Sequence, residues 1–206
     1  METTALQTRL SPQIQELELE QFVLQLEVDG LCVVPPEKTG VPPETIKAIA
    51  ERLLFEAEEV VGCGFDLNKG PKAELTMSAD ENVIAQFSGD RGEPTQFLVQ
   101  QLCARDRLFR DLAINPIGVA LIRHLIGQNA TRFSSHNAFI KWQGEFGYGQ
   151  NLGLHCDQIA VPRPWGRNAL TANTNWCITD YSLDGGALAY VPGSHRRMEP
   201  PRFPEA

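Results

Sequence analysis

The stretch NWCITDYSLDGGALAYVPGSH at residues 175–195 decides the fold class of this chain, together with the shorter stretch LHCDQ at residues 154–158. Two runs with β character, residues 169–180 and 187–191, lie on either side of the turn sequence Asp184-Gly185-Gly186. An Asp-Gly pair between two such runs is a strong signal for a β-hairpin. From residue 131 onward we therefore predict β structure, with strands at residues 133–142, 153–158, 169–180 and 187–191.

The part of the chain before residue 131 has helical periodicity instead, with prolines at helix starts and glycines at helix ends. The predicted elements are helices at residues 11–30, 43–62 and 115–127, helical spacing around residues 97–102, a short strand at residues 31–34, and a long irregular surface segment at residues 64–92. Helices followed by short strands are typical of an α+β fold. We predict an N-terminal helical region, residues 1–130, that packs on a sandwich or barrel core begun by residues 131–206, the two together forming one domain.

Composition restricts the function classes. The chain has 206 residues and a formal net charge of −8, which argues against nucleic-acid binding and against docking on an anionic membrane surface. Neither a secretory signal at the N-terminus nor an apolar run long enough to span a bilayer is present in the sequence. The five cysteines include no CxxC pair, so neither a disulfide framework nor a thiolate zinc site is indicated. These features predict a soluble, cytoplasmic protein.

The His155-Cys156-Asp157 tripeptide is the main candidate for chemistry. On an extended backbone the side chains at positions i and i+2 share a face, so His155 and Asp157 can reach one metal ion while Cys156 points away. One imidazole and one carboxylate are two of the three ligands in the facial triad of non-haem Fe(II) oxygenases. Taken alone the tripeptide is weak evidence, and the alternative is a His and an Asp that bond to neighbouring groups.

Four motifs together resemble the phytanoyl-CoA dioxygenase family of Fe(II)/2-oxoglutarate oxygenases. These are the HxD tripeptide, the W-x-x-x-D run from Trp176, the G-x-L turn from Gly186, and the VPGSH sequence at residues 191–195. The resemblance covers about residues 17–197. It implies a double-stranded β-helix (jelly roll) with packed helices and an Fe(II) ion held by His155 and Asp157. It also implies 2-oxoglutarate as co-substrate, and dioxygen and a small organic or acyl molecule as the other substrates.

The resemblance also suggests which residues bind 2-oxoglutarate. Asn137 matches a family co-substrate position, and Lys141 shares its strand face by the period-2 rule. Trp176 matches a family tryptophan that packs on the co-substrate. Asn173 and Asn175 should lie on the opposite face of a regular strand from Trp176.

The sequence departs from the family pattern after the VPGSH motif. The family places a second iron-binding histidine and a 2-oxoglutarate-binding arginine several strands later, and neither follows in this sequence. His195 belongs to the VPGSH turn, which in the family does not bind iron. We therefore expect that the C-terminal strands of the jelly roll are missing and that the enzyme is incomplete in this chain. One alternative is a non-catalytic jelly-roll binding module derived from the family, and a less favoured one is a hydrolase that uses Cys156 or a zinc-bound water.

Overall fold

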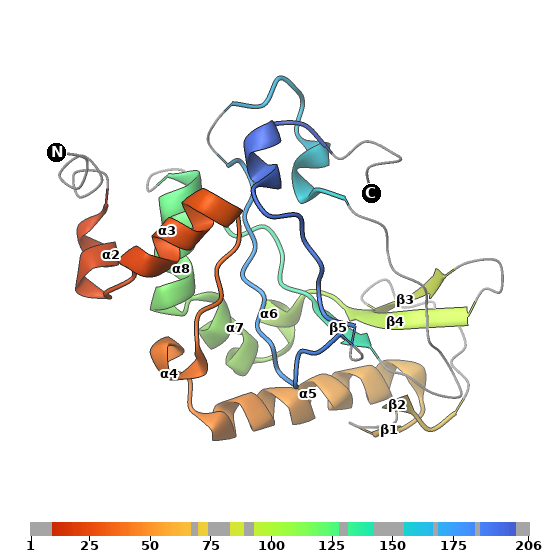
Figure 1. Cartoon of the computed structure of the whole chain (residues 1–206). Helices are drawn as coiled ribbons and strands as arrows, with labels where there is room; N and C mark the ends of the chain where they lie inside the picture. Colours follow the sequence, from red (N-terminus) through yellow and green to blue (C-terminus); the bar gives the residue numbers. More distant parts are fainter. Residues whose placement is uncertain are drawn as a thin grey trace, which may run out of the picture.

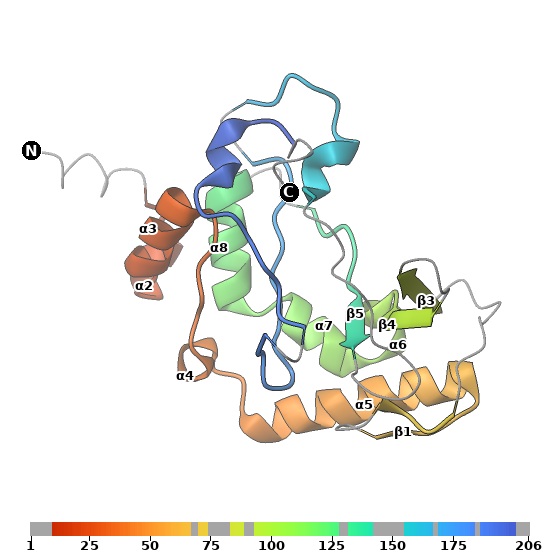
Figure 2. The same cartoon turned by 45° about the vertical axis from the view of Figure 1, so that its right-hand side comes forward.

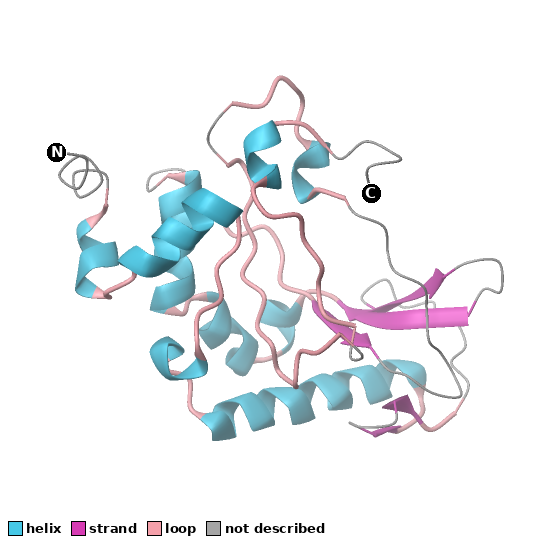
Figure 3. Cartoon of the chain, in the orientation of Figure 1, coloured by secondary structure: helices cyan, strands magenta, loops and turns pink. Residues whose placement is uncertain are grey.

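A computed structural model gives the arrangement of the chain (Figure 1). The structure describes residues 10–66, 70–73, 83–88, 93–127, 132–141, 155–166, 169–183 and 186–200. Helices form one side and the base of the molecule, small sheets lie opposite, and extended segments run between them (Figure 3). The molecule is thus mixed helix and strand, as the sequence predicted.

Three helices form the first packing unit, α2 (Pro12–Glu16), α3 (Glu20–Asp29) and α8 (Pro116–Ile126). They share a buried cluster that includes Ile14, Leu19 and Leu121. The single helix predicted for residues 11–30 is wrong in one respect, because the backbone breaks at Glu18, whose φ is +51°. The break turns α2 against α8 and lets Leu19, which is fully buried, enter the shared cluster.

A second group of helices surrounds the other buried cluster. It consists of α5 (Pro43–Val61), α6 (Leu102–Arg105) and α7 (Arg107–Ala113), while the short helix α4 (Pro36–Thr39) precedes α5 and has no buried residue. The long helix α5 forms the base of the molecule in Figures 1 and 2. Ile49 and Phe109 are each 1% exposed in the cluster that joins α5 to α7. The predicted start of α5 at Pro43 and its end at Gly62, where φ is +71°, are both confirmed.

Two small antiparallel sheets complete the regular structure. Strands β1 (Phe65–Asp66) and β2 (Gly70–Pro71) pair with each other, and β3 (Val83–Ser88), β4 (Glu93–Val99) and β5 (Ala138–Lys141) follow the order β3-β4-β5. The prediction of an irregular segment at residues 64–92 is therefore wrong where β1, β2 and β3 form. The prediction of helical spacing around residues 97–102 is wrong for residues 97–99, which belong to β4. A short apolar run fits either a helix or a strand, and here the pairing of Leu98 with Phe139 across β4 and β5 decides for a strand.

The described residues of the C-terminal part form fewer strands than the sequence predicted. The predicted strand at residues 133–142 is confirmed only for β5, and the described residues of 31–34, 169–180 and 187–191 are extended or irregular without forming a strand ladder. Of the strand predicted at residues 153–158, residues 153–154 lie outside the described ranges and Cys156 is extended, but the prediction is wrong from Asp157 onward, where a 3₁₀-helix occupies Asp157–Ala160. Local hydrogen bonds such as Ile159 N to Cys156 O at 3.2 Å satisfy this backbone in place of a neighbouring strand. The described residues do not form a closed jelly roll, so that architecture remains an expectation from the family.

Residues 193–196 return to the end of α3. The Gly193 amide donates to the Asp29 carbonyl at 2.8 Å, and Arg196 donates to the Val28 carbonyl at 3.0 Å. The His195 ring lies directly against Gly30, which ends α3 with a φ of +81° and has no room for a side chain. The contact anchors the C-terminal extended segment to the first group of helices. None of the helices in the described ranges is long and apolar enough to cross a membrane.

Candidate functional site

The side chains of His155 and Asp157 converge, as the sequence predicted. His155 Nε2 lies 3.3 Å from Asp157 Oδ1, and the two side chains are 69% and 53% exposed. Between them Cys156 is extended, with φ −130° and ψ 136°, so its neighbours project to the same side. The extended backbone assumed from the sequence is thus present at Cys156, directly before the 3₁₀-helix begins at Asp157.

A second polar side chain reaches the same carboxylate. The amide Nδ2 of Asn173 donates a hydrogen bond to Asp157 Oδ2, the oxygen that does not face His155. Nearby, the Leu170 amide donates to Gln158 Oε1 at 3.0 Å. Two hydrogen bonds, to Asp157 and to Gln158, therefore connect the turn after His155 to the extended segment that begins at residue 169.

The donor set of this pair fits two ligands of a metal ion. Ligand atoms about 2.1 Å from a metal and adjacent around it are about 3 Å apart, close to the observed 3.3 Å. A neutral imidazole nitrogen and a carboxylate oxygen are also the donors of a facial triad. Within the described ranges no group of three His, Cys, Asp or Glu side chains is placed to hold a metal ion. The described site therefore supplies two ligands, and His195 is engaged at Gly30 instead.

The three predicted co-substrate residues do not gather on one face. Exposure alternates along β5, with Ala138 and Ile140 half-buried and Lys141 exposed. Trp176 packs against the same buried cluster as Ala138 and Ile140. Lys141 lies on the alternate face of the strand, where its Nζ donates to the Gly186 carbonyl at 2.8 Å.

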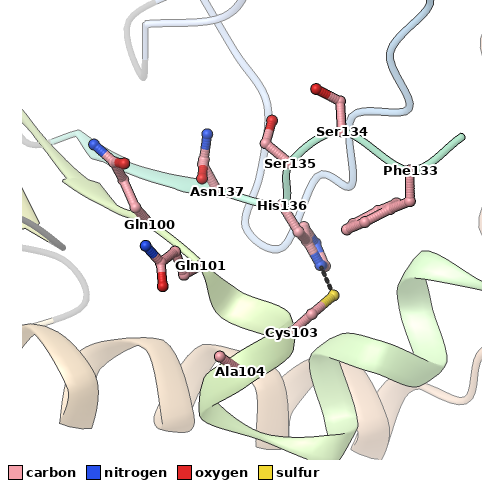
Figure 4. Close-up of a pocket in the computed structure, with 9 residues that line it drawn as sticks. All are labelled: Gln100, Gln101, Cys103, Ala104, Phe133, Ser134, Ser135, His136 and Asn137. Carbon is pink, nitrogen blue, oxygen red and sulfur yellow. Dashed lines mark hydrogen bonds between the residues drawn. The ribbon is translucent and has the colours of Figure 1, made fainter.

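Asn137 lines a pocket of about 290 Å³ between the turn that precedes α6 and residues 133–137 (Figure 4). The lining comprises Gln100, Gln101, Cys103, Ala104, Phe133, Ser134, Ser135, His136 and Asn137. Neither His155 nor Asp157 belongs to it. The structure thus places Asn137 in a cavity, but not in one that the HxD pair lines.

The pocket contains a thiol–imidazole contact that sequence reasoning missed. Cys103 Sγ lies 3.4 Å from His136 Nδ1, although 33 positions separate the two residues. Burial raises the pKa of the Cys103 thiol, with Arg110 acting in the opposite direction, and burial lowers the pKa of His136. Both shifts favour the neutral thiol and imidazole over a thiolate–imidazolium pair. No sequence spacing signals such a pair. The pairing of β4 with β5, together with the bond from the Leu102 amide to the His136 carbonyl at 2.9 Å, brings the two residues together.

Comparison with known proteins gives the context of the site. The family model for phytanoyl-CoA dioxygenase matches residues 26–206. Among curated proteins, the protein named dioxygenase af480 from Aspergillus fumigatus is 32% identical over 104 residues, which is 50% of this chain. The match spans 32% of that relative's length. No solved structure matches the chain. Because the family model covers most of the sequence, including the HxD and VPGSH motifs, the chain belongs to the phytanoyl-CoA dioxygenase family.

Proposed function

We propose that this chain carries the metal-binding part of an Fe(II)/2-oxoglutarate-dependent dioxygenase that hydroxylates a small organic or acyl substrate. The observation that carries the proposal is the convergence of His155 Nε2 and Asp157 Oδ1 at 3.3 Å, in the one tripeptide that matches the family's ligand motif. The relative named as a dioxygenase supports the same reaction class.

In this proposal the protein's task is to hold and orient the reactants. Fe(II) with 2-oxoglutarate supplies the activation of dioxygen, which no side chain can perform. His155 would supply a neutral imidazole nitrogen and Asp157 a carboxylate charge. The carboxylate would also partly neutralise the cation, and the small number of protein ligands would leave coordination positions for other molecules. A third protein ligand would have to come from residues outside this pair.

The proposed roles of Asn137, Lys141 and Trp176 toward 2-oxoglutarate rest on the family motif alone. Lys141 is the cationic member of this set, and a carboxylate would compete with the Gly186 carbonyl for its ammonium group. Trp176 would act through its apolar face, which half-burial against the core already holds in place. These assignments predict weaker co-substrate binding, rather than loss of metal, when any of the three is replaced.

The test is metal and co-substrate binding by the full chain under anaerobic conditions. Fe(II) is titrated with and without 2-oxoglutarate, and the visible charge-transfer band of an iron–oxo-acid chelate is recorded. We expect His155→Ala and Asp157→Ala to abolish the band and Cys156→Ala, the matched neighbour, to retain it. A band that survives in His155→Ala would refute the assignment. Absence of any metal binding by the unaltered chain would favour the non-catalytic binding module.

A further inference from the structure

We infer that Asn173 is a positioning residue for Asp157, holding the carboxylate so that one oxygen is presented beside His155. The inference rests on the proposed function, because it concerns the same metal site. Its structural basis is that the two carboxylate oxygens of Asp157 have different partners. Oδ1 lies 3.3 Å from His155 Nε2, while Oδ2 accepts the hydrogen bond from Asn173 Nδ2.

An aspartate needs such a partner because its terminal torsion is soft. Rotation of the carboxylate about the Cβ–Cγ bond is broad and nearly two-fold, so an unrestrained carboxylate presents either oxygen or both. Asp157 is 53% exposed, and solvent alone would not select one orientation. A donor fixed on Oδ2 leaves Oδ1 as the oxygen that faces the imidazole.

Asn173 is itself held by packing rather than by the metal site. Along its extended segment Asn173, Asn175 and Cys177 are exposed, while Trp176 and Ile178 pack against the core cluster. Thr174 lies against Gly118 in the first turn of α8, where a Cβ on the glycine would be 3.5 Å from it. These contacts fix the register of the segment. The register places residue 173 on the outward face, as the alternation in the sequence predicted.

A second tie restricts the same turn. The Leu170 amide binds the side chain of Gln158, the residue directly after Asp157, at 3.0 Å. The segment therefore holds residues 157 and 158 through two hydrogen bonds that start three positions apart. A rotation of the Asp157 backbone would break both of them.

The amide also suits a cation site chemically. It donates a hydrogen bond without adding charge, so Asp157 keeps its full negative charge for a metal. A lysine or arginine in its place would compete with the cation. By occupying Oδ2, Asn173 also disfavours bidentate binding of the carboxylate, which would use an additional position on the metal. Partners of this kind typically change metal affinity 10–100-fold when they are removed.

The experiment measures Mn(II) affinity of the full chain by electron paramagnetic resonance for Asn173→Ala, Asn173→Gln, Asn175→Ala and His155→Ala. We expect a loss of about 10–100-fold for Asn173→Ala and partial recovery for Asn173→Gln, which retains an amide. Asn175→Ala removes the same group from the next outward position and should bind like the unaltered chain. The Co(II) absorption spectrum of Asn173→Ala should also change, because a freed carboxylate alters the coordination.

The outcomes distinguish the positioning role of Asn173 from the metal site itself. If His155→Ala loses Mn(II) binding and Asn173→Ala binds as tightly as the unaltered chain with an unchanged Co(II) spectrum, the positioning role is refuted and the metal site stands. If His155→Ala also binds Mn(II) normally, the proposed function fails first. Circular dichroism checks that each variant is folded. Should Asn173→Ala not fold, Asn173→Gln and Asn173→Ser decide, with weaker binding supporting the role and equal binding in both refuting it.

Discussion

The guanidinium of Arg105 lies 2.6 Å from the carboxylate of Glu56, although the two residues are 49 positions apart in the chain. Glu56 is 8% exposed, and its other oxygen accepts a 2.5 Å hydrogen bond from Arg52 one turn earlier in α5. Arg105 also donates to the Gln100 carbonyl at 2.8 Å. One buried carboxylate thus connects the C-terminal half of α5 to the last residue of α6, beside the pocket.

Glu56→Ala should destabilise the protein by about 3 kcal/mol, because it removes the carboxylate from the largely buried Arg105 guanidinium, while Arg52 keeps Asp106 at 3.5 Å. Chemical denaturation measures the change in the free energy of unfolding. Glu51→Ala is the matched control on the same helix. Its carboxylate is 3.9 Å from Lys47 and largely exposed, so the cost should stay below about 1 kcal/mol. Equal losses in the two variants would contradict a structural role for the buried pair.

Asn115 should stabilise the fold through both the oxygen and the nitrogen of its side-chain amide. Its Oδ1 accepts from the Ile117 and Gly118 amides and caps α8, and its Nδ2 donates to the Thr39 carbonyl at 3.0 Å. Asn115→Ala removes all three bonds and should cost about 1–3 kcal/mol in thermal or chemical denaturation. Asn115→Ser keeps a capping oxygen and loses the bond to Thr39, so its stability should be intermediate. A serine variant no better than alanine would show that the cap contributes little.

His136 should make stability depend on pH. Burial lowers the pKa of its imidazole in the folded protein, so near pH 6.5 and below the unfolded chain binds a proton that the folded chain resists. The contribution of the neutral His136 to the free energy of unfolding is fully present above the pKa that it has in the unfolded chain. This contribution is lost as the pH falls toward its lower pKa in the folded protein. Between pH 7.5 and pH 5.5 the unaltered chain should therefore lose more stability than His136→Asn. The test compares how much stability each protein loses between the two pH values, not their stabilities at one pH, because His136→Asn also loses ring contacts with Phe109 and Phe133. A steeper loss in the variant would contradict the sign.

Trp176 should have a structural effect separable from its proposed binding role. Truncation to alanine removes a half-buried ring from the core cluster and should cost about 2 kcal/mol, less than for a fully buried ring. Trp176→Phe should recover most of this stability. In the proposed enzyme, Trp176→Ala should raise the 2-oxoglutarate concentration needed for the iron charge-transfer band while Fe(II) binding persists. An unchanged requirement in a folded variant would remove Trp176 from the co-substrate site.

Local signals in the sequence were sufficient where neighbouring residues determine the conformation. Proline at the first helical position and a glycine after the last turn predicted α5 and α8 correctly. The i, i+2 spacing predicted that His155 and Asp157 would converge, because this needs only one extended residue between them. These predictions depend on a few adjacent backbone torsions, which the residues themselves favour.

Long-range pairing explains what the sequence could not predict. The β3–β4 hairpin was hidden because its apolar runs are too short to separate helical from strand periodicity. The bond from Asn173 to Asp157 depends on the register that Trp176 and Thr174 impose from other elements. The Cys103–His136 contact likewise requires β4 and β5 to be paired first. In each case the partner is chosen by packing, which a single sequence does not reveal.

The return of residues 193–196 to the end of α3 has a consequence for protein synthesis. The Arg196 side chain and its acceptor at Val28 are separated by 168 positions, so the helix leaves the ribosome long before its partner exists. During that interval the Val28 and Asp29 carbonyls lack the donors that they meet in the folded chain. We therefore expect the Gly193 amide, which donates to the Asp29 carbonyl, to become protected from hydrogen exchange late, after α2 and α3 have formed. Stalled nascent chains that end before residue 193 lack both donors, whereas chains that expose residue 196 can form both bonds, and only these longer chains should show a protected Gly193 amide.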